Sequence, residues 1–406
     1  MQPTIEKPDA ASLGSEGLAR RRLAVATVAL FLAGLFALMA APAQSAEQGL
    51  PKITGSLSRF GADAAAALGI KDLKAASDPT ASGLGLLYPK LDRIYQLYNL
   101  EQGTKRLAVV ERSLDTLAIT RTLVIPDHSA MLANDASGAE WVATFNTKDD
   151  RLYIAYRPSG GLQGAVTAPD KLPGLLGIDL RSFAYSDSTF PNFVVSTADS
   201  SLILVGLEYD ESTDTLLALQ EAIRSDTAVA NALVLVGWQA AALVKGGPLP
   251  QVTPRPVRAC KRDPVSDASS PFLTPMLIAS APDPDDGGRV KTWVTFPCYS
   301  TNYSTNVVIV RLDRATALDP NASDEKAVVA PAGVINWALD GAHGRMYLVN
   351  NSAETDAWVY EVASNAFVGI IALSPKNALE ANSIALGVDE QSGRLYGRAP
   401  SYGLMI

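Results

Sequence analysis

The sequence has few of the residues on which common catalytic motifs depend. Its 406 residues include two His and two Cys, which excludes zinc sites built from several residues of either type. It has no Gly-Lys dipeptide, so a P-loop is absent, and no Gly-x-Ser-x-Gly elbow. Lys and Arg total 34 against 42 Asp and Glu, and the net charge of −8 argues against a nucleic-acid partner. A hydrophobic fraction of 48% is sufficient for a folded core.

The first 46 residues have the pattern of an export signal. Arg20, Arg21 and Arg22 precede an uncharged run of 19 residues, Leu23–Ala41, and small residues follow it. This order predicts a secretory signal peptide over residues 1–46. The length of the run is close to that of a membrane-spanning helix, so an uncleaved N-terminal anchor is the alternative. Either outcome places the rest of the chain outside the cytoplasm, secreted, at the cell surface or in the periplasm, with membrane contact only through this segment.

The two cysteines are the only possible disulfide pair within one chain. A bridge between Cys260 and Cys298 closes a loop of about 38 residues, which corresponds to a stabilisation on the order of 3–4 kcal/mol. An oxidising compartment favours this bridge, and the alternative is two unpaired buried thiols.

Beyond residue 80 a unit of short strands and turns repeats along the chain. The clearest copy, residues 335–371, contains four strands with an Asp-Gly turn after the first, and a turn followed by Arg, an aliphatic residue and Tyr recurs elsewhere. Sheets of this size cannot bury both faces alone, so the repeat predicts an all-β fold, a β-propeller of six to seven four-stranded blades over residues 83–406. The completeness of the last blade at the C-terminus is left open, and a β-sandwich or mixed chain is the alternative. Residues 47–82 form a separate N-terminal segment, in which residues 62–68 are typical of a helix or loop.

One of these units resembles a known family. The strand Tyr347–Asn350, preceded by Leu339–Gly341 and followed by Val359–Val362, resembles the YVTN-type repeat of extracellular and periplasmic β-propellers. The resemblance extends loosely over residues 83–406 and implies the propeller architecture. It implies no particular activity, because such folds carry many unrelated functions.

A proline-rich stretch interrupts the repeats. Residues 246–288 hold nine of the 25 prolines and include Cys260. Because proline is excluded from central strands, the stretch predicts a long excursion from the propeller body. Long ordered loops are often functional, so a partner surface is expected there first.

Local motifs offer little chemistry. His128 follows Pro126 and Asp127 directly, and adjacent residues of this kind do not converge on one substrate atom, so a turn role is expected. His343 lies within a glycine-rich turn and is expected to be exposed. We also expect a solvated acidic turn formed by Asp283, Asp285 and Asp286.

A second acidic pattern resembles the start of a calcium loop. Asp319, Asn321 and Ser323 alternate as calcium ligands do, but Asp324 stands where a Gly is expected and Ala330 where a Glu would complete the site.

The sequence therefore favours an exported β-propeller that acts as a binding or interaction module for a protein, glycan or small-molecule ligand, with no cofactor assigned. The alternative is a metal-dependent, lactonase-like hydrolase with its site at the central channel. A wall-associated structural module is a third hypothesis. Three or four Asp, Glu or Asn oxygens converging on one point of the channel would favour the enzyme.

Overall fold

The chain divides into two compact units, Met1–Leu50 and Pro51–Ile406. A computed structural model describes parts of the second unit only. The described residues are 63–69, 85–100, 106–130, 142–158, 174–188, 200–224, 232–243, 252–261, 276–283, 286–299, 307–329, 334–350, 356–372, 385–390, 394–399 and 403–405. The predicted signal segment 1–46 lies outside them.

The described residues form six antiparallel sheets, and in five of them the strands follow one another in chain order. The first sheet contains β1 (Gly85–Tyr88), β2 (Arg93–Leu100), β3 (Arg106–Ser113) and β4 (Ile119–Pro126). The second contains β5 (His128–Ala130), β6 (Ala143–Asn146), β7 (Arg151–Pro158), β8 (Gly174–Asp179) and β9 (Ala184–Ser188), and both β5 and β6 pair with β7. The third contains β10 (Ser200–Asp210), β11 (Thr215–Arg224), β12 (Ala232–Gln239) and β13 (Arg255–Lys261).

The remaining three sheets continue this pattern. The fourth contains β14 (Leu277–Pro282), β15 (Val290–Tyr299), β16 (Val307–Asp313) and β17 (Lys326–Val329). The fifth contains β18 (Val334–Asp340), β19 (Arg345–Asn350), β20 (Asp356–Glu361) and β21 (Ala366–Ala372). The sixth contains β22 (Ala385–Asp389), β23 (Arg394–Ala399) and β24 (Gly403–Met405). Short 3-10 helices are η2 (Pro89–Leu91), η4 (Ala240–Ala242) and η6 (Arg314–Thr316).

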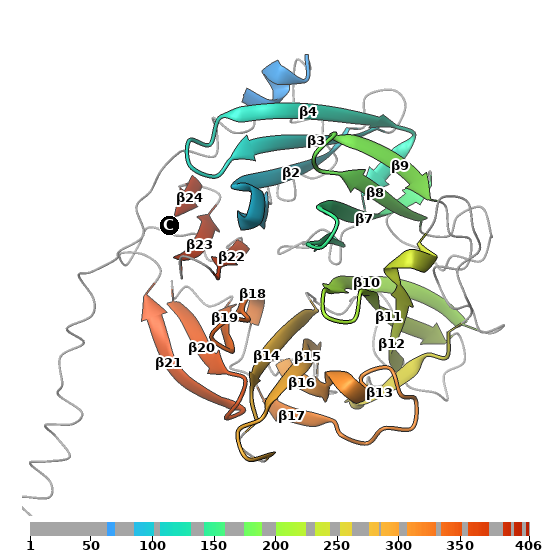
Figure 1. Ribbon diagram of the computed structural model, residues 1–406, viewed down its shortest axis with the longest axis vertical. Coiled ribbons are helices and arrows are strands. Elements are labelled where there is room, and N and C mark those ends of the chain that lie inside the picture. Colours follow the sequence, from blue (N-terminus) through green and yellow to red (C-terminus); the bar gives the residue numbers. More distant parts are fainter. Residues whose placement is uncertain are drawn as a thin grey trace, which may run out of the picture. The chain divides into compact units, whose positions relative to one another are not determined.

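The six sheets are arranged in a closed ring within residues 51–406 (Figure 1). Each sheet lies beside the next one along the chain: β5 against β2 and β3, β10 against β6, β14 against β10, β18 against β14, and β22 against β18. β22 also lies against β1, so the sixth sheet meets the first. This arrangement confirms the predicted all-β propeller and excludes the β-sandwich.

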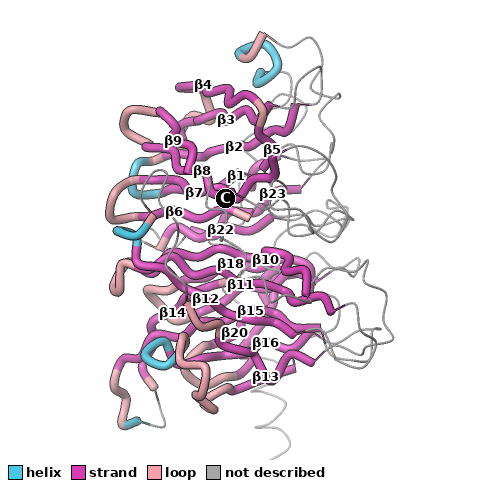
Figure 2. The backbone as a smooth tube through the Cα atoms, turned by 90° about the vertical axis from the view of Figure 1, so that its right-hand side faces the viewer, coloured by secondary structure: helices cyan, strands magenta, loops and turns pink. Residues whose placement is uncertain are grey.

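The repeated turn of the sequence has a simple conformational cause. The turns that lead into β2, β7, β11 and β19 each end in a residue with positive φ, which glycine adopts freely and aspartate tolerates better than most residues. The next strand begins directly afterwards, with Arg in three of the four cases. These turn residues are Asp92 (φ 56°), Asp150 (φ 51°), Asp214 (φ 54°) and Gly344 (φ 62°). Figure 2 shows the described turns gathered along one side of the sheets.

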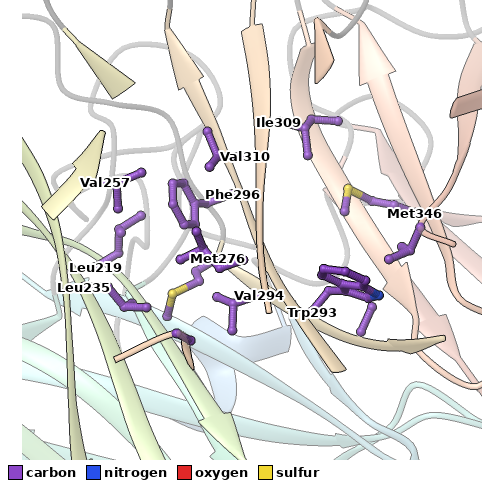
Figure 3. Close-up of a cluster of buried hydrophobic side chains, with 14 of the residues drawn as sticks. Leu219, Leu235, Val257, Met276, Trp293, Val294, Phe296, Ile309, Val310 and Met346 are labelled. Atoms are coloured by element: carbon purple, nitrogen blue, oxygen red, sulfur yellow. The ribbon is translucent and has the colours of Figure 1, made fainter. Parts of the chain in front are cut away.

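The hydrophobic core lies between neighbouring sheets. In the largest cluster, side chains of the third sheet meet those of the fourth, which in turn meet those of the fifth (Figure 3). The third sheet contributes Leu219, Leu235 and Val257, and the fourth contributes Phe296 among others. A sheet in the middle of such a series is covered on both faces, so each sheet depends on its two neighbours for burial.

A short helix at residues 63–67 belongs to the N-terminal segment. Its Ala64 is fully buried against Tyr98, Leu100 and Val110 of the first sheet. The segment was expected to form a helix or loop at this place. No helix among the described residues is long and apolar enough to span a membrane.

The proline-rich stretch differs from the expectation of one excursion across residues 246–288. It contains β13 at the outer edge of the third sheet and β14 at the inner edge of the fourth. Pro256 is tolerated in β13 because an edge strand has one side without ladder hydrogen bonds. Cys260 belongs to β13 and Cys298 to β15, and these two strands contact each other. The two sulfur positions lie outside the described side chains, so the disulfide stays a prediction.

We predict that Gly387→Val weakens the closure of the ring. A Cβ atom at Gly387 of β22 would overlap the side chain of Leu87 on β1. Overpacking of this kind lowers the free energy of unfolding by about 1–3 kcal/mol, measurable by urea unfolding. Gly369→Val on β21 is the matched control, because nothing lies within 4 Å of a Cβ there. Equal stability of the two variants would contradict contact between the first and sixth sheets.

Candidate functional site

Two glutamates lie on or directly after inner strands on opposite sides of the ring, and one of them affects the pKa of the other. Glu208 lies on β10, one of the inner strands, and Glu390 follows β22. The third and sixth sheets, which carry them, face each other in a ring of six (Figure 1). Burial, followed by repulsion from Glu390, raises the pKa of Glu208 to about 8. Near neutral pH this side chain is therefore mostly protonated. A positive charge placed beside it would stabilise its ionised form.

Glu390 is held in place by the neighbouring sheet. Its Oε1 accepts a hydrogen bond of 2.9 Å from the backbone N–H of Gly341, in the turn between β18 and β19. A Cβ at Gly341 would lie 2.9 Å from the same oxygen, so a side chain at this position would push the carboxylate away. The side chain of Glu390 is otherwise exposed, whereas Glu208 is only partly accessible. The pair thus combines one solvated and one enclosed carboxylate.

Most other buried acidic groups are neutralised where two sheets meet. Asp150 of the second sheet accepts hydrogen bonds from Tyr88 Oη (2.8 Å) and Arg181 Nε (2.7 Å), and lies 2.9 Å from Lys90 Nζ. The contact with Lys90 is the largest cause that lowers the pKa of Asp150 to about 2. Because Tyr88 and Lys90 belong to the first sheet, Asp150 joins two sheets.

Glu111 and Arg121 form a similar junction. Glu111 is 1% exposed and accepts hydrogen bonds from Arg121, Thr120 (2.6 Å) and Tyr95 (3.0 Å). Burial alone would raise the pKa of Glu111, but these hydrogen bonds lower it. Arg121 also donates to the carbonyl oxygens of Leu180 (2.6 Å) and Arg181 (2.9 Å) in the second sheet.

The third and fourth sheets are joined in the same way. Arg255, whose side chain is fully buried on β13, donates to Asp324 at 2.7 Å and to the carbonyl oxygen of Thr316 at 2.6 Å. Asp210, the last residue of β10, pairs with Arg314 of η6. These charged groups connect the two sheets. Their carboxylates are already bound by basic side chains of the protein.

His343 lies in a turn as expected, whereas His128, which was also expected in a turn, is the first residue of a strand. His128 starts β5, its Nδ1 contacts the carbonyl oxygen of Pro126, and its ring packs edge-on against Tyr156 at 4.3 Å between centroids. His343 is 55% exposed, and its Nδ1 lies 2.8 Å from Asp340 in the same turn. Neither histidine is among the groups that shift the pKa of Glu208.

The acidic residues of the two sequence patterns form hydrogen bonds and ion pairs within the protein. Asp319 accepts a hydrogen bond of 2.9 Å from the backbone N–H of Asn321, and Asp324 is bound to Arg255 and Thr316. Asp283 is 1% exposed and pairs with Lys291 at 2.8 Å, so it is buried where a solvated position was expected.

No group of three or more His, Cys, Asp or Glu residues placed to hold a metal ion occurs in the described parts of the chain. Glu208 and Glu390 supply two carboxylates at the centre of the ring. The lactonase-like alternative needs further oxygen ligands beside them, and no third His, Cys, Asp or Glu is grouped with them among the described residues.

Sequence reasoning missed Glu208 and Glu390. Glu208 interrupts an apolar run in β10, between Leu207 and Tyr209, and a charged residue within a buried strand is a signal that could have been used. Glu390 lies in a polar turn and gives no such signal. Their proximity follows only from closure of the ring.

No family model and no curated protein matches the sequence. Among solved structures, an uncharacterized protein from Listeria monocytogenes EGD-e is 7% identical and covers 77% of this chain and 79% of its own, with a TM-score of 0.38. An acylaminoacyl peptidase from Pyrococcus horikoshii is 9% identical over 75% of this chain, which spans 41% of the peptidase, with a TM-score of 0.38. The Myceliophteria thermophila Cps50 (Swd1) β-propeller domain is 11% identical and covers 81% of this chain and 96% of its own, with a TM-score of 0.37. The fold assignment rests on the sheet topology of this chain.

We predict that Glu208→Gln makes stability less sensitive to alkaline pH. The pKa of Glu208 is about 8 in the folded protein against an ordinary 4.5, so its contribution to stability is complete below pH 4.5 and is lost as pH rises to about 8. The variant has no such titration and should be more stable than the original protein above pH 8, by roughly 2–4 kcal/mol. Urea unfolding at a series of pH values measures the difference. Glu361→Gln, the same change on β20, should follow the original profile, and parallel profiles for all three proteins would contradict the assignment.

Proposed function

We propose that this protein is an exported, YVTN-like β-propeller that binds a basic group of its ligand at the centre of the ring, between Glu208 and Glu390. Two observations support the proposal: Glu208 and Glu390 lie on or directly after the inner strands of the third and sixth sheets, and repulsion from Glu390 contributes to the raised pKa of Glu208. The buried carboxylates Asp150, Glu111, Asp210 and Asp283 each have a basic partner within the protein, such as Lys90 for Asp150. For Glu208, burial and then repulsion from Glu390 raise the pKa instead.

A cation between the two carboxylates removes this repulsion. Binding lowers the pKa of Glu208 and releases its proton, so affinity for a cation increases with pH until Glu208 is fully ionised. An ammonium or guanidinium group satisfies this requirement. Such groups occur on lysine and arginine side chains of a protein, on amino sugars of a glycan and on small polyamines, which are the three ligand classes that the sequence leaves open.

The interaction is directional because of Gly341. The N–H of Gly341 donates to one carboxylate oxygen of Glu390, and the other oxygen is proposed to bind the ligand. Glu208 provides the second carboxylate from β10 of the third sheet. A ligand that places one amine near each carboxylate therefore gains more than one with a single amine.

The proposed organisation of the chain follows the sequence. Residues 1–46 direct export, as a cleaved signal or an anchor, residues 47–82 form the N-terminal segment, and residues 83–406 form the propeller. Placement at the cell surface, in the periplasm or in the medium provides the oxidising conditions under which Cys260 and Cys298 pair.

Export and the disulfide are tested together on protein isolated from outside the cytoplasm. We expect it to begin after residue 46, or to remain membrane-associated through that segment, and to yield a disulfide-linked peptide pair containing Cys260 and Cys298 under non-reducing mass spectrometry. The same peptides from a reduced sample are the control. Free thiols at both positions in the exported protein would contradict the bridge, and recovery of all protein from the cytoplasm would contradict export.

Ligand binding is tested with trilysine peptide by isothermal titration calorimetry. We expect trilysine to bind roughly tenfold more tightly at pH 9 than at pH 7, because Glu208 with a pKa of about 8 becomes ionised over this interval. Glu208→Gln should remove this pH dependence and weaken binding by about tenfold or more, as expected for loss of a charged hydrogen bond.

Two controls separate this site from general attraction to an acidic protein. Glu361→Gln removes one negative charge from β20 and should bind trilysine as the original protein does. Triglycine lacks the side-chain amines and should not bind. Equal weakening by Glu208→Gln and Glu361→Gln, or equal affinity at the two pH values, would contradict the proposed site.

A further inference from the structure

The outer strand of the fifth sheet has an unusual surface. In β21, Val368 and Ile370 are each 53% exposed and Ile371 is 40% exposed. The strand Ala366–Ala372 contains no charged residue and no proline. Three of the large apolar residues that are exposed in the described parts of the chain therefore lie within four consecutive positions of one strand. Single exposed apolar residues are ordinary, but a run on a strand edge favours association.

The other outer strands carry features that oppose pairing between edges. Such features are charged side chains and prolines, which interrupt the hydrogen-bond ladder or bring like charges together. They are Arg121 and Pro126 in β4, Asp187 in β9, Pro256 and Arg258 in β13, and Lys326 in β17. β21 is the exception among the outer strands of the first five sheets.

The geometry of β21 leaves one edge open. The strand pairs with β20 along one side, and no strand of the described residues pairs with its other side. A register shift near Val368 bends the first part of the strand, so the regular part is Gly369–Ala372. There Ile370 lies opposite Trp358 and Ile371 opposite Ala357, which places the two isoleucines on opposite faces of the sheet.

We propose that this edge of β21 pairs with β21 of a second copy of the chain to form an antiparallel, two-fold symmetric dimer. A two-fold axis at Ile370 places it opposite the partner's Ile370 and places Ile371 opposite the partner's Gly369. Nothing lies within 4 Å of a Cβ at Gly369, so there is room for an isoleucine. Antiparallel pairing of this kind satisfies the free N–H and C=O groups of both edges.

Charge favours a second copy as the occupant. In a two-fold antiparallel pair, a charged residue near the axis faces its own copy, and like charges directly opposite each other are destabilising. A strand can pair with its own copy in this way only if it carries no charged residue near the axis. Among the longer outer strands of the described sheets, β21 fulfils this condition. The contact is small: a few backbone groups and three apolar side chains from each copy bury less than the roughly 1,200 Å² typical of stable complexes. The dimer is therefore reversible, with dissociation in the micromolar range or above.

Sedimentation velocity of the purified full chain over a range of concentrations tests the dimer. We expect the average sedimentation coefficient of the original protein to rise with concentration, and Ile370→Lys to sediment as a monomer throughout because it places two ammonium groups together at the axis. Val290→Lys, which adds the same charge at a residue 71% exposed on β15, should associate as the original protein does.

A charge-complementation experiment makes the result specific to this register. Ile370→Glu alone should also be monomeric, whereas an equimolar mixture of Ile370→Lys and Ile370→Glu should associate, because opposite charges then meet at the axis. Association of this mixture beyond either variant alone, with both folded by circular dichroism, supports the pairing. A monomeric original protein at all concentrations, association of Ile370→Lys equal to the original, or no gain in the mixture would overturn it.

Discussion

A small antiparallel sheet has two apolar faces and no means of covering either by itself. In this protein each sheet is covered by its two neighbours, as the cluster shared by the third, fourth and fifth sheets shows. The contact of β22 with β1 extends this covering to the first and last sheets and closes the ring. Burial between sheets is therefore the constraint on which the rest depends, since the channel and its facing carboxylates exist only in a closed ring.

The charged groups fall into two classes: those located between neighbouring sheets and those on the inner strands of the ring. Asp150 and Arg255 accept from or donate to residues of the neighbouring sheet, whereas Glu111 is bound within its own sheet by Arg121, which in turn donates to the second sheet. Their pairing offsets the cost of burying charge and fixes the register of the sheets. Glu208 and Glu390 instead lie on or directly after inner strands, and no basic group of the described residues is among the causes that shift the pKa of Glu208, which is why the proposed ligand is positively charged.

The sequence predicted the architecture because its signals are local. The turns that end at Asp92, Asp150 and Gly344 need positive φ, and the strands beside them alternate β-branched and aromatic residues, so the repeat could be read directly. The strands within residues 246–288 were missed because β13 and β14 lie at sheet edges, where proline is tolerated. Glu208 and Glu390 could not be paired from the sequence, because their proximity is set by closure of the ring and not by spacing along the chain.

The coupling of Glu208 to Glu390 is the most direct test, because the third and sixth sheets bring these residues together only in the closed ring. NMR titration of selectively labelled glutamate carboxyl groups, in the original protein and in Glu390→Gln, measures it. The account predicts that Glu208 titrates near pH 8 and that Glu390→Gln moves this titration to lower pH. A Glu208 that titrates at its ordinary value near 4.5, or one that Glu390→Gln leaves unchanged, would contradict the proposed site.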